Sequence, residues 1–329
     1  MSDKEENYRE MPGINYSLLK KIEKHPTGIK KEMNEDSKAL ALGSLFDFVL
    51  TEDLSKINDY FLILKKEIQE PSNKIVKNIL TQIKERFNPK DLNDLTESTI
   101  AEICKEFEFG GANWSDSTLK NKMIAYNDFY KVYFDERILI LKEDYDKTLI
   151  LINSYRESSF YKEAMLDESI SVSYQEIVNE EIEEVLYKGK LDKVLFYSKD
   201  KVIQPIDIKT TQDHLPETYD QVTFKMLKFR YDLQGSLYTN LLRKKYPDWK
   251  VLPMKFIFFS YITPDKHPVA VEMSEEQILK SQHGFNFDNK YYKGWKQLAE
   301  EYFYYQYEIG SFEIHKECIE NNFIFKFEL

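Results

Sequence analysis

Two residues of opposite charge alternate along one short segment of the chain. The segment PIDIKTT holds Asp207 and Lys209 with one apolar residue between them. In a strand, side chains at i and i+2 point to the same face and lie roughly 7 Å apart. The two charges therefore share one face, while Ile206 and Ile208 share the other. A carboxylate and an ammonium on a rigid strand are suited to holding a metal ion beside a positioned water.

A second carboxylate, Asp192, lies in the preceding segment, YKGKLDKVLF. A hairpin through the turn 198–200 would bring it beside Asp207. Two converging carboxylates supply the oxygen ligands that Mg²⁺ or Mn²⁺ prefers. Such an ion polarises a phosphodiester and lowers the pKa of a bound water, and Lys209 adds a compact positive charge. The pattern predicts metal-dependent hydrolysis without a covalent intermediate.

The next predicted helix carries Gln234 and Tyr238, which share one helix face because they lie four residues apart. Both can reach back to the strand ends. For an isolated D-x-K the alternative is an exposed ion pair on an edge strand. The succession of a G-x-x-D strand, a D-x-K strand and this helix favours a catalytic site.

Composition describes a globular chain. Of 329 residues, 42% are hydrophobic and 15% aromatic, with 10 Gly and 10 Pro, which favours a large packed interior. The 46 Lys and Arg against 57 Asp and Glu give a net charge of −11, so nucleic-acid contact through overall charge is excluded and any such contact is local.

Cysteine and histidine usage excludes other chemistries. The two cysteines, Cys104 and Cys318, are too few for the four thiolates of an iron–sulfur cluster, and the five histidines do not pair with them at zinc spacing. No phosphate-binding glycine loop is present. No secretory signal and no apolar run of about 18 residues occurs, so we expect a cytoplasmic protein without membrane contact.

Hydrophobic periodicity predicts the elements. Helices are expected over 17–25, with Ser17 as N-cap, over 37–50, over about 216–246, and from a capping box at Ser274 through Trp295 toward Tyr305. Three β-rich runs after 168 predict a strand meander, and MKFIFFSYI and HPVAVEM predict two further strands. This succession predicts an α/β (α+β) fold in which helices flank a mixed central sheet.

Changes in the pattern of apolar and charged residues divide the chain into four parts. We expect an N-terminal helical part of the core, a mostly helical insertion, the main core and a C-terminal extension, over 1–52, 53–165, 166–310 and 311–329.

Three motifs occur in a specific order: YKGKLDKVLF, PIDIKTT and YDLQGSLYTNLL. They fit a G-x-x-D, D-x-K and Q-x-x-x-Y signature, on which the chain resembles phage and RecE-type exodeoxyribonuclease VIII proteins of the PD-(D/E)xK superfamily. These are related to the RecB nuclease domain and lambda exonuclease. The resemblance implies a restriction-endonuclease-like core, with Asp192 and Asp207 as metal ligands and Lys209 as the catalytic lysine. It implies that Gln234 and Tyr238 support the site or contact DNA.

Two further acidic residues enter through the resemblance. In ALGSLFDFVLTED, Asp47 stands where the family has a metal-ligating histidine, so it is either an oxygen-donor replacement or a helix residue with a structural partner. Glu168 matches an acidic position that some relatives use near the metal. Its alternative is a solvated carboxylate at a helix end.

Local basic and aromatic groups are candidates for DNA contact. Lysines and arginines gather in the N-terminal segment and in the helical segment after the D-x-K strand, where they either line a phosphate track or form solvated helix faces. The residues are Lys20, Lys21, Lys24, Lys30, Lys31, Lys225, Lys228, Arg230, Arg243, Lys244 and Lys245. The aromatics Tyr219, Phe224, Phe229 and Tyr231 either stack on frayed bases or belong to the core.

The sequence thus predicts a Mg²⁺- or Mn²⁺-dependent deoxyribonuclease. The resemblance implies an exonuclease on linear duplex ends in phage-type recombination or DNA processing, with a single-strand annealing protein and further copies of the chain as candidate partners. An endonuclease or single-strand nuclease on the same core is a second reading. A third is a nuclease-fold DNA-binding or scaffold subunit that no longer cuts.

Overall fold

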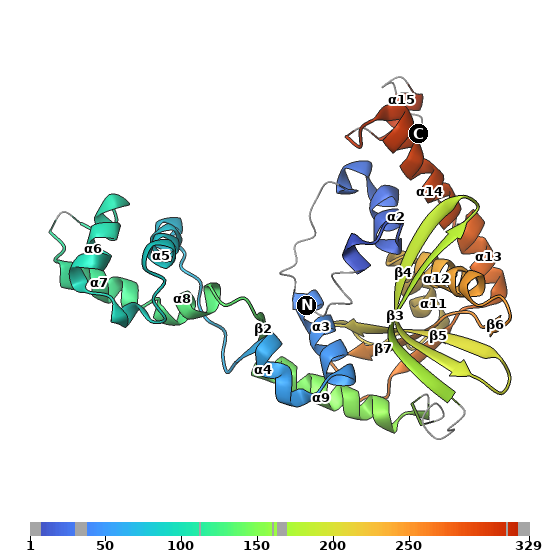
Figure 1. Cartoon of the computed structure of the whole chain (residues 1–329), viewed down its shortest axis with the longest axis horizontal. Coiled ribbons are helices and arrows are strands. Elements are labelled where there is room, and N and C mark those ends of the chain that lie inside the picture. The colour runs from blue at the N-terminus through green and yellow to red at the C-terminus, as the bar shows by residue number, and fades with distance from the viewer. Residues whose placement is uncertain are drawn as a thin grey trace. The chain divides into compact units, whose positions relative to one another are not determined.

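The computed structural model describes residues 8–29, 38–111, 113–159, 161–162, 170–313 and 315–321. The chain divides into two compact units. The smaller unit is Glu52–Asp146, and the larger unit consists of Met1–Thr51 together with Lys147–Leu329. Figure 1 shows the elements of both, coloured from the N-terminus to the C-terminus.

A mixed sheet forms the centre of the larger unit (Figure 1). Its strands are β3 (Ile170–Ile182), β4 (Val185–Tyr197), β5 (Val202–Thr211), β6 (Lys250–Val251), β7 (Lys255–Ser260) and β8 (Val269–Glu272). The order is β3-β4-β5-β7-β8, with the short β6 also pairing with β5. All neighbours are antiparallel except β5 with β6 and β7, which are parallel. The predicted meander and the mixed α+β fold are confirmed.

Helices cover both faces of this sheet. The larger unit contains α2 (Tyr16–Lys24), a 3₁₀ turn (Pro26–Ile29), α3 (Lys38–Thr51), α11 (Tyr219–Lys228), α12 (Tyr231–Lys245), α13 (Glu275–His283), α14 (Trp295–Phe303), a π-helical turn (Tyr304–Ile309) and α15 (Lys316–Glu320), and α9 (Lys142–Glu157) enters it at Lys147. Alternation along β7 sends Phe256 and Phe258 into the core beneath α12. On the other face Phe259 contacts Phe46 of α3 and Tyr155 of α9.

The helix α12 is the most deeply buried helix of the site region. Ten of its fifteen residues are buried, including the small residues Gly235 and Ser236. The Ser236 hydroxyl donates to the Ile278 carbonyl (2.6 Å) and accepts from the Trp295 indole (3.0 Å), which ties α12 to α13 and α14. This fixes the helix against β3 and β4, so side chains projecting from it toward the sheet are rigidly placed.

The strands β4 and β5 pair only near their hairpin. Their pairing runs from Tyr197 with Val202 to Lys193 with Ile206 and then stops. Pairing of β4 with β3 is also interrupted at Asp192, opposite Gln175, which has a left-handed φ of 53°. The sheet therefore opens beside Asp192.

Three predicted boundaries are wrong. The N-cap of α2 is Asn15, not Ser17, because Tyr16 is already helical. The predicted helix over 216–246 is two helices, since Arg230 takes φ 57° between α11 and α12. The last predicted helix is also interrupted: α13 ends at His283, and the hairpin of β9 (Phe285–Phe287) and β10 (Lys290–Tyr292) precedes α14. Gly284, at φ 95°, makes that exit possible.

The smaller unit is mainly helical. It contains the 3₁₀ turns Leu54–Lys56 and Leu92–Asp94, the strands β1 (Phe61–Leu64) and β2 (Ile138–Leu141), and the helices α4 (Ile57–Tyr60), α5 (Lys74–Phe87), α6 (Glu97–Glu106), α7 (Asp116–Ile124) and α8 (Asn127–Tyr133). The two strands pair in parallel, and the helices enclose a separate apolar core that includes Ile79, Leu80 and Ile100. In the described part of the chain, no helix combines the length and apolar character needed to cross a membrane.

Removing the α2 cap tests the corrected boundary. Asn15 Oδ1 accepts a hydrogen bond from the Leu18 amide (2.8 Å), so Asn15→Ala should lower the free energy of unfolding by about 1 kcal/mol. The exposed Ser17 carries no such cap, and Ser17→Ala should stay within about 0.5 kcal/mol of the wild type. Urea unfolding measures both, and an equal loss in the two variants would contradict the assignment.

Candidate functional site

Asp207 and Lys209 form a charge pair on the face of β5 that looks toward α12. The carboxylate of Asp207 is 2% exposed, and Lys209 Nζ lies 2.7 Å from its Oδ2. Their neighbours Ile206 and Ile208 are buried on the opposite face. The alternation expected from the sequence is therefore present, and the exposed edge-strand ion pair is not what the structure shows, because β5 lies between β4 and β7.

Gln234 bridges the two charges from α12. Its Nε2 donates to Asp207 Oδ1 (2.6 Å), and its Oε1 accepts from Lys209 Nζ (2.9 Å). Only one orientation of the amide satisfies both partners, since a carboxylate accepts and an ammonium donates. One neutral side chain thus holds both charged groups at fixed positions.

Asp192 lies at the opening between β4 and β5. Its Oδ2 accepts a hydrogen bond from the Ile208 amide (2.8 Å), which replaces the interrupted ladder. Ile208 stands between Asp207 and Lys209 in the sequence, so this hydrogen bond places the half-buried carboxylate of Asp192 beside the charge pair on β5. The hairpin brings Asp192 to Asp207, as the sequence predicts.

Asp47 faces the same charges from α3. Burial raises its pKa well above the ordinary value, and the carboxylates of Asp192 and Asp207 raise it further. Glu168 lies outside the described residues. Within the described part of the chain, no three Asp, Glu, His or Cys side chains form a ready cluster for a metal ion. A cation here would need water or substrate oxygens to complete its shell.

Burial sets the electrostatics of the site. It raises the pKa of Asp207 to about 7, and the nearby carboxylate of Asp192 adds to the rise while Lys209 opposes it. Burial also raises the pKa of Asp192, against Lys209 and the Ile208 amide. For Lys209, burial acts to lower the pKa, but the carboxylates of Asp207 and Asp192 outweigh it, so the ammonium stays charged.

Tyr238 contributes by packing against Gly189, the glycine of the G-x-x-D segment. A Cβ atom on Gly189 would lie 2.8 and 2.9 Å from two carbons of the Tyr238 ring. The ring is 5% exposed, and burial raises its hydroxyl pKa, with the carboxylates of Asp207 and Asp192 also contributing. The glycine and the tyrosine of the motif therefore fit each other, which fixes α12 against β4 at the site.

Sequence reasoning named Tyr231 and Lys20 only as candidates for DNA contact and did not place them beside Lys209. The Tyr231 ring lies under the ammonium, 4.7 Å from Nζ to the ring centre. Lys20 of α2 also lies near Lys209. Burial lowers the pKa of Lys20, and the positive charge of Lys209 lowers it further. Tyr231 precedes Gln234 by three residues, so shared helix-face spacing was a signal for it. Lys20 carried no comparable signal, because its position depends on how α2 packs.

Three of the basic residues named as candidates for a phosphate track form ion pairs within the protein. Arg230 is buried and pairs with Glu23 and Asp232. Arg243 pairs with Glu275 (2.7 Å), and Lys245 pairs with Glu176 (2.7 Å). Acidic partners within the fold therefore neutralise these three residues. Lys30 and Lys31 lie outside the described residues.

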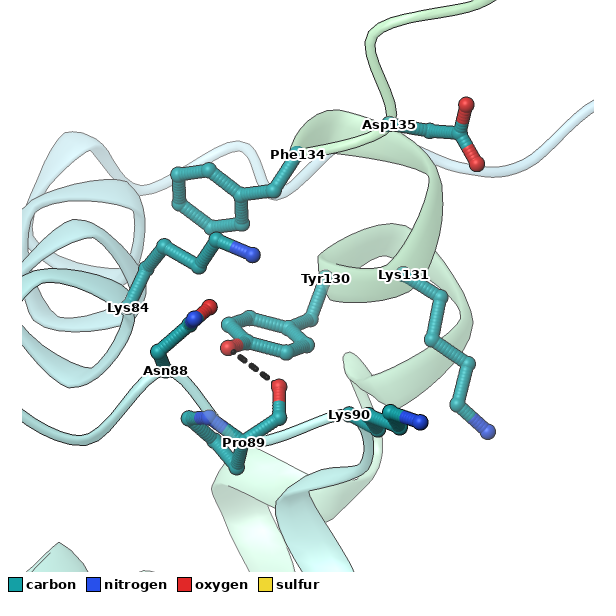
Figure 2. Close-up of a pocket in the computed structure, with 8 residues that line it drawn as sticks. All are labelled: Lys84, Asn88, Pro89, Lys90, Tyr130, Lys131, Phe134 and Asp135. Carbon is teal, nitrogen blue, oxygen red and sulfur yellow. Dashed lines mark hydrogen bonds between the residues drawn. The ribbon is translucent and has the colours of Figure 1, made fainter.

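The smaller unit has a cavity of its own, of about 370 Å³ (Figure 2). Its lining is Lys84, Asn88, Pro89, Lys90, Tyr130, Lys131, Phe134 and Asp135. The Tyr130 hydroxyl donates to the Pro89 carbonyl (2.9 Å), and Lys131 pairs with Asp91. Asp135 is paired with Arg137. With its one lining carboxylate already neutralised, this cavity lacks the converging acidic groups of the β4–β5 site.

No family model and no curated protein sequence matches the chain. Among solved structures, it is similar to a protein from Eubacterium rectale described as a "putative exonuclease", with a TM-score of 0.37 and 13% identity over 80% of this chain and 97% of that one. It is also similar to SSO0001, with a TM-score of 0.24 and 12% identity over 92% of this chain and 99% of that one. Because both TM-scores are below 0.5, neither likeness carries an argument about activity.

The fit between Gly189 and Tyr238 can be tested by a double-mutant cycle. Gly189→Ala should destabilise by about 1–3 kcal/mol, because the added methyl group overlaps the ring. Tyr238→Ala removes the overlap, so the double variant should lose at least about 0.5 kcal/mol less than the sum of the single losses in urea unfolding. Strict additivity would contradict the fit. As a control, Gly43→Ala in α3, where a Cβ meets nothing within 4 Å, should stabilise by about 0.5–1 kcal/mol.

The buried carboxylate predicts a pH-dependent stability. Because the pKa of Asp207 is raised in the folded chain, that chain binds the proton more tightly than the unfolded one. In a chelating buffer, stability should therefore fall as pH rises from about 4 to about 7. Asp207→Asn cannot titrate and should lose less stability across this window, whereas the exposed control Asp200→Asn should follow the wild type. Parallel curves for wild type and Asp207→Asn would contradict the assignment.

Proposed function

We propose that this protein is a metal-dependent nuclease that hydrolyses DNA phosphodiester bonds. The observation that carries the proposal is the arrangement of Asp207, Lys209 and Gln234 beside Asp192 where the sheet opens. A buried acid, a partly buried lysine and one amide that fixes both are more than a structural ion pair requires, since removing charges from water is costly. The ordered motifs that resemble the PD-(D/E)xK superfamily support DNA as the substrate.

The donor set fits a hard divalent cation. Asp207 Oδ2 is buried and lies 2.7 Å from the Lys209 ammonium, with no hydrogen bond of regular geometry among the described residues, so this oxygen keeps a lone pair for a cation. Asp192 keeps one carboxylate oxygen beyond that used by the Ile208 amide, and Asp47 faces both. These oxygens would hold Mg²⁺ or Mn²⁺ together with water and phosphate oxygens. When bound, the ion would polarise the phosphodiester and activate a water for attack.

The chain's own residues then position the reaction. Lys209 stays protonated because the two carboxylates favour its charged form, so its ammonium can hold the attacking water or stabilise charge on the phosphate oxygens. Gln234 holds that ammonium and the Asp207 carboxylate at fixed positions. The Tyr231 ring supports Lys209 from below. Little reorganisation of these groups is needed during the reaction.

The finer parts of the proposal concern substrate and setting. We propose an exonuclease that acts on ends of linear duplex DNA in phage-type recombination, with Mg²⁺ as the natural cation. A single-strand annealing protein and further copies of the chain are the proposed partners, and a cytoplasmic setting would keep the free Cys104 and Cys318 reduced.

Cleavage assays test the proposal. End-labelled linear duplex, nicked circle and closed circle are incubated with Mg²⁺ or with a chelator. The wild type should shorten linear duplex only with Mg²⁺ and leave the closed circle intact. Asp207→Asn removes a metal ligand and Lys209→Ala removes the positive charge, so each should lower the rate by about 100-fold or more.

Matched variants separate the site from general damage. Asp200→Asn and Lys250→Ala change the same residue types at exposed positions and should keep wild-type rates. Equal rates in the site variants would refute the assigned residues, product in the chelator would refute metal dependence, and no product from the wild type on any substrate would refute the nuclease.

A further inference from the structure

A groove of about 360 Å³ runs beside α11, just beyond the end of β5. Apolar and basic side chains share its lining, which consists of Asp213, His214, Leu215, Pro216, Gln221, Phe224, Lys225, Lys228, Phe229 and Ile262. Phe224 is 66% exposed and Ile262 51%, and Tyr219, at the start of α11, is 92% exposed. Large apolar side chains gathered at one exposed place mark a binding surface more often than they mark chance.

An aromatic path joins this groove to the charge pair. Phe229 in the groove wall stacks on Tyr231, with ring centres 5.5 Å apart and planes 23° apart. Tyr231 in turn lies under Lys209. Tyr16 of α2 fixes the junction between α11 and α12, because its hydroxyl donates to the Phe229 carbonyl (2.5 Å). The groove is therefore one aromatic layer away from the proposed reaction centre.

Cations accompany the rings along this path. Lys228 Nζ lies 5.4 Å from the centre of the Phe224 ring and 5.3 Å from that of Phe229. Lys225 Nζ is 3.4 Å from Oγ1 of Thr211, which follows Asp207 and Lys209 in the alternation of β5. Against these two lysines the lining has one carboxylate, that of Asp213. The groove thus combines faces for stacking with positive charge.

We infer that this groove binds an unpaired nucleobase of the DNA strand whose phosphate lies at Asp207 and Lys209, with the base against Phe224 and Phe229 and a flanking phosphate near Lys228. The inference rests on the proposed function and deepens it. Rings interleaved with cations suit a single strand, which needs a stacking face for each base and a positive charge for each phosphate. A paired base keeps its faces inside the duplex stack and cannot fill the groove.

This occupant fits better than an apolar peptide. A peptide segment would use the apolar lining but would bring no anion to Lys228, whereas a nucleotide engages both the rings and this lysine. Stacking is tolerant of base identity, so the groove would select unpaired strands without selecting sequence. An exonuclease with such a groove would separate the end of its duplex before cleavage.

Binding without cleavage tests the inference. Fluorescence anisotropy in a chelating, low-salt buffer compares a labelled thymidine decamer with an abasic decamer that carries the same phosphates. The wild type should bind the thymidine decamer about tenfold more tightly. Phe224→Ala should remove most of this preference and Phe224→Trp should keep it. Lys228→Ala should weaken both decamers by the same factor, because it contributes charge rather than a stacking face.

Controls and the cleavage assay separate the two claims. Phe287→Ala removes another exposed aromatic, on β9, and should leave both affinities unchanged, as should Lys250→Ala. Equal affinity of the wild type for the two decamers, binding of neither, or a preference that survives Phe224→Ala overturns the inference. A protein that prefers the thymidine decamer but cleaves no DNA supports the groove and refutes the nuclease, and one that cleaves without any preference does the reverse.

Discussion

The burial of two opposite charges on one strand is the constraint on which the rest of the larger unit depends. Removing the carboxylate of Asp207 and the ammonium of Lys209 from water is costly, and their attraction compensates only when geometry and further hydrogen bonds are good. Gln234 supplies a donor to one and an acceptor to the other. Even so, the raised pKa of Asp207 shows that burial is not fully offset. A buried carboxylate whose charge is not fully compensated is a place where a cation can bind.

The surrounding fold keeps this arrangement in place. Gln234 can reach β5 only if α12 lies close to the sheet, and the absence of a side chain at Gly189 lets Tyr238 pack there. The same helix is anchored on its far side through Ser236. The pairing of β4 with β5 stops at Ile206, and the Ile208 amide donates to the Asp192 side chain instead of to the backbone of β4. Helix packing, strand register and charge together therefore fix the positions of the site's side chains.

Local patterns in the sequence predict the centre of the site well. Strand alternation places Asp207 and Lys209 on one face, and a short hairpin fixes Asp192 beside them, because both rules act over a few residues. These rules do not predict contacts between residues that lie far apart in the sequence. The ion pairs of Arg243 with Glu275 and of Lys245 with Glu176 depend on how helices pack, so these side chains looked like free basic groups.

Element boundaries failed for related reasons. Helical periodicity continues through Arg230, whose left-handed conformation accompanies burial and pairing with residues such as Glu23 far along the chain. Asn15 and Ser17 are equally good caps in isolation, and only the first helical residue, Tyr16, decides between them. Propensity gives the kind of element, whereas tertiary contacts set where it stops.

In the function proposed above, the carboxylates at the opening of the sheet hold a divalent cation. The most direct measurement is anomalous scattering from crystals of the protein grown with Mn²⁺. We expect a peak bound by oxygens of Asp192 and Asp207, near Lys209, and no such peak in Asp207→Asn. A fully occupied peak elsewhere, or none at these carboxylates, would contradict it.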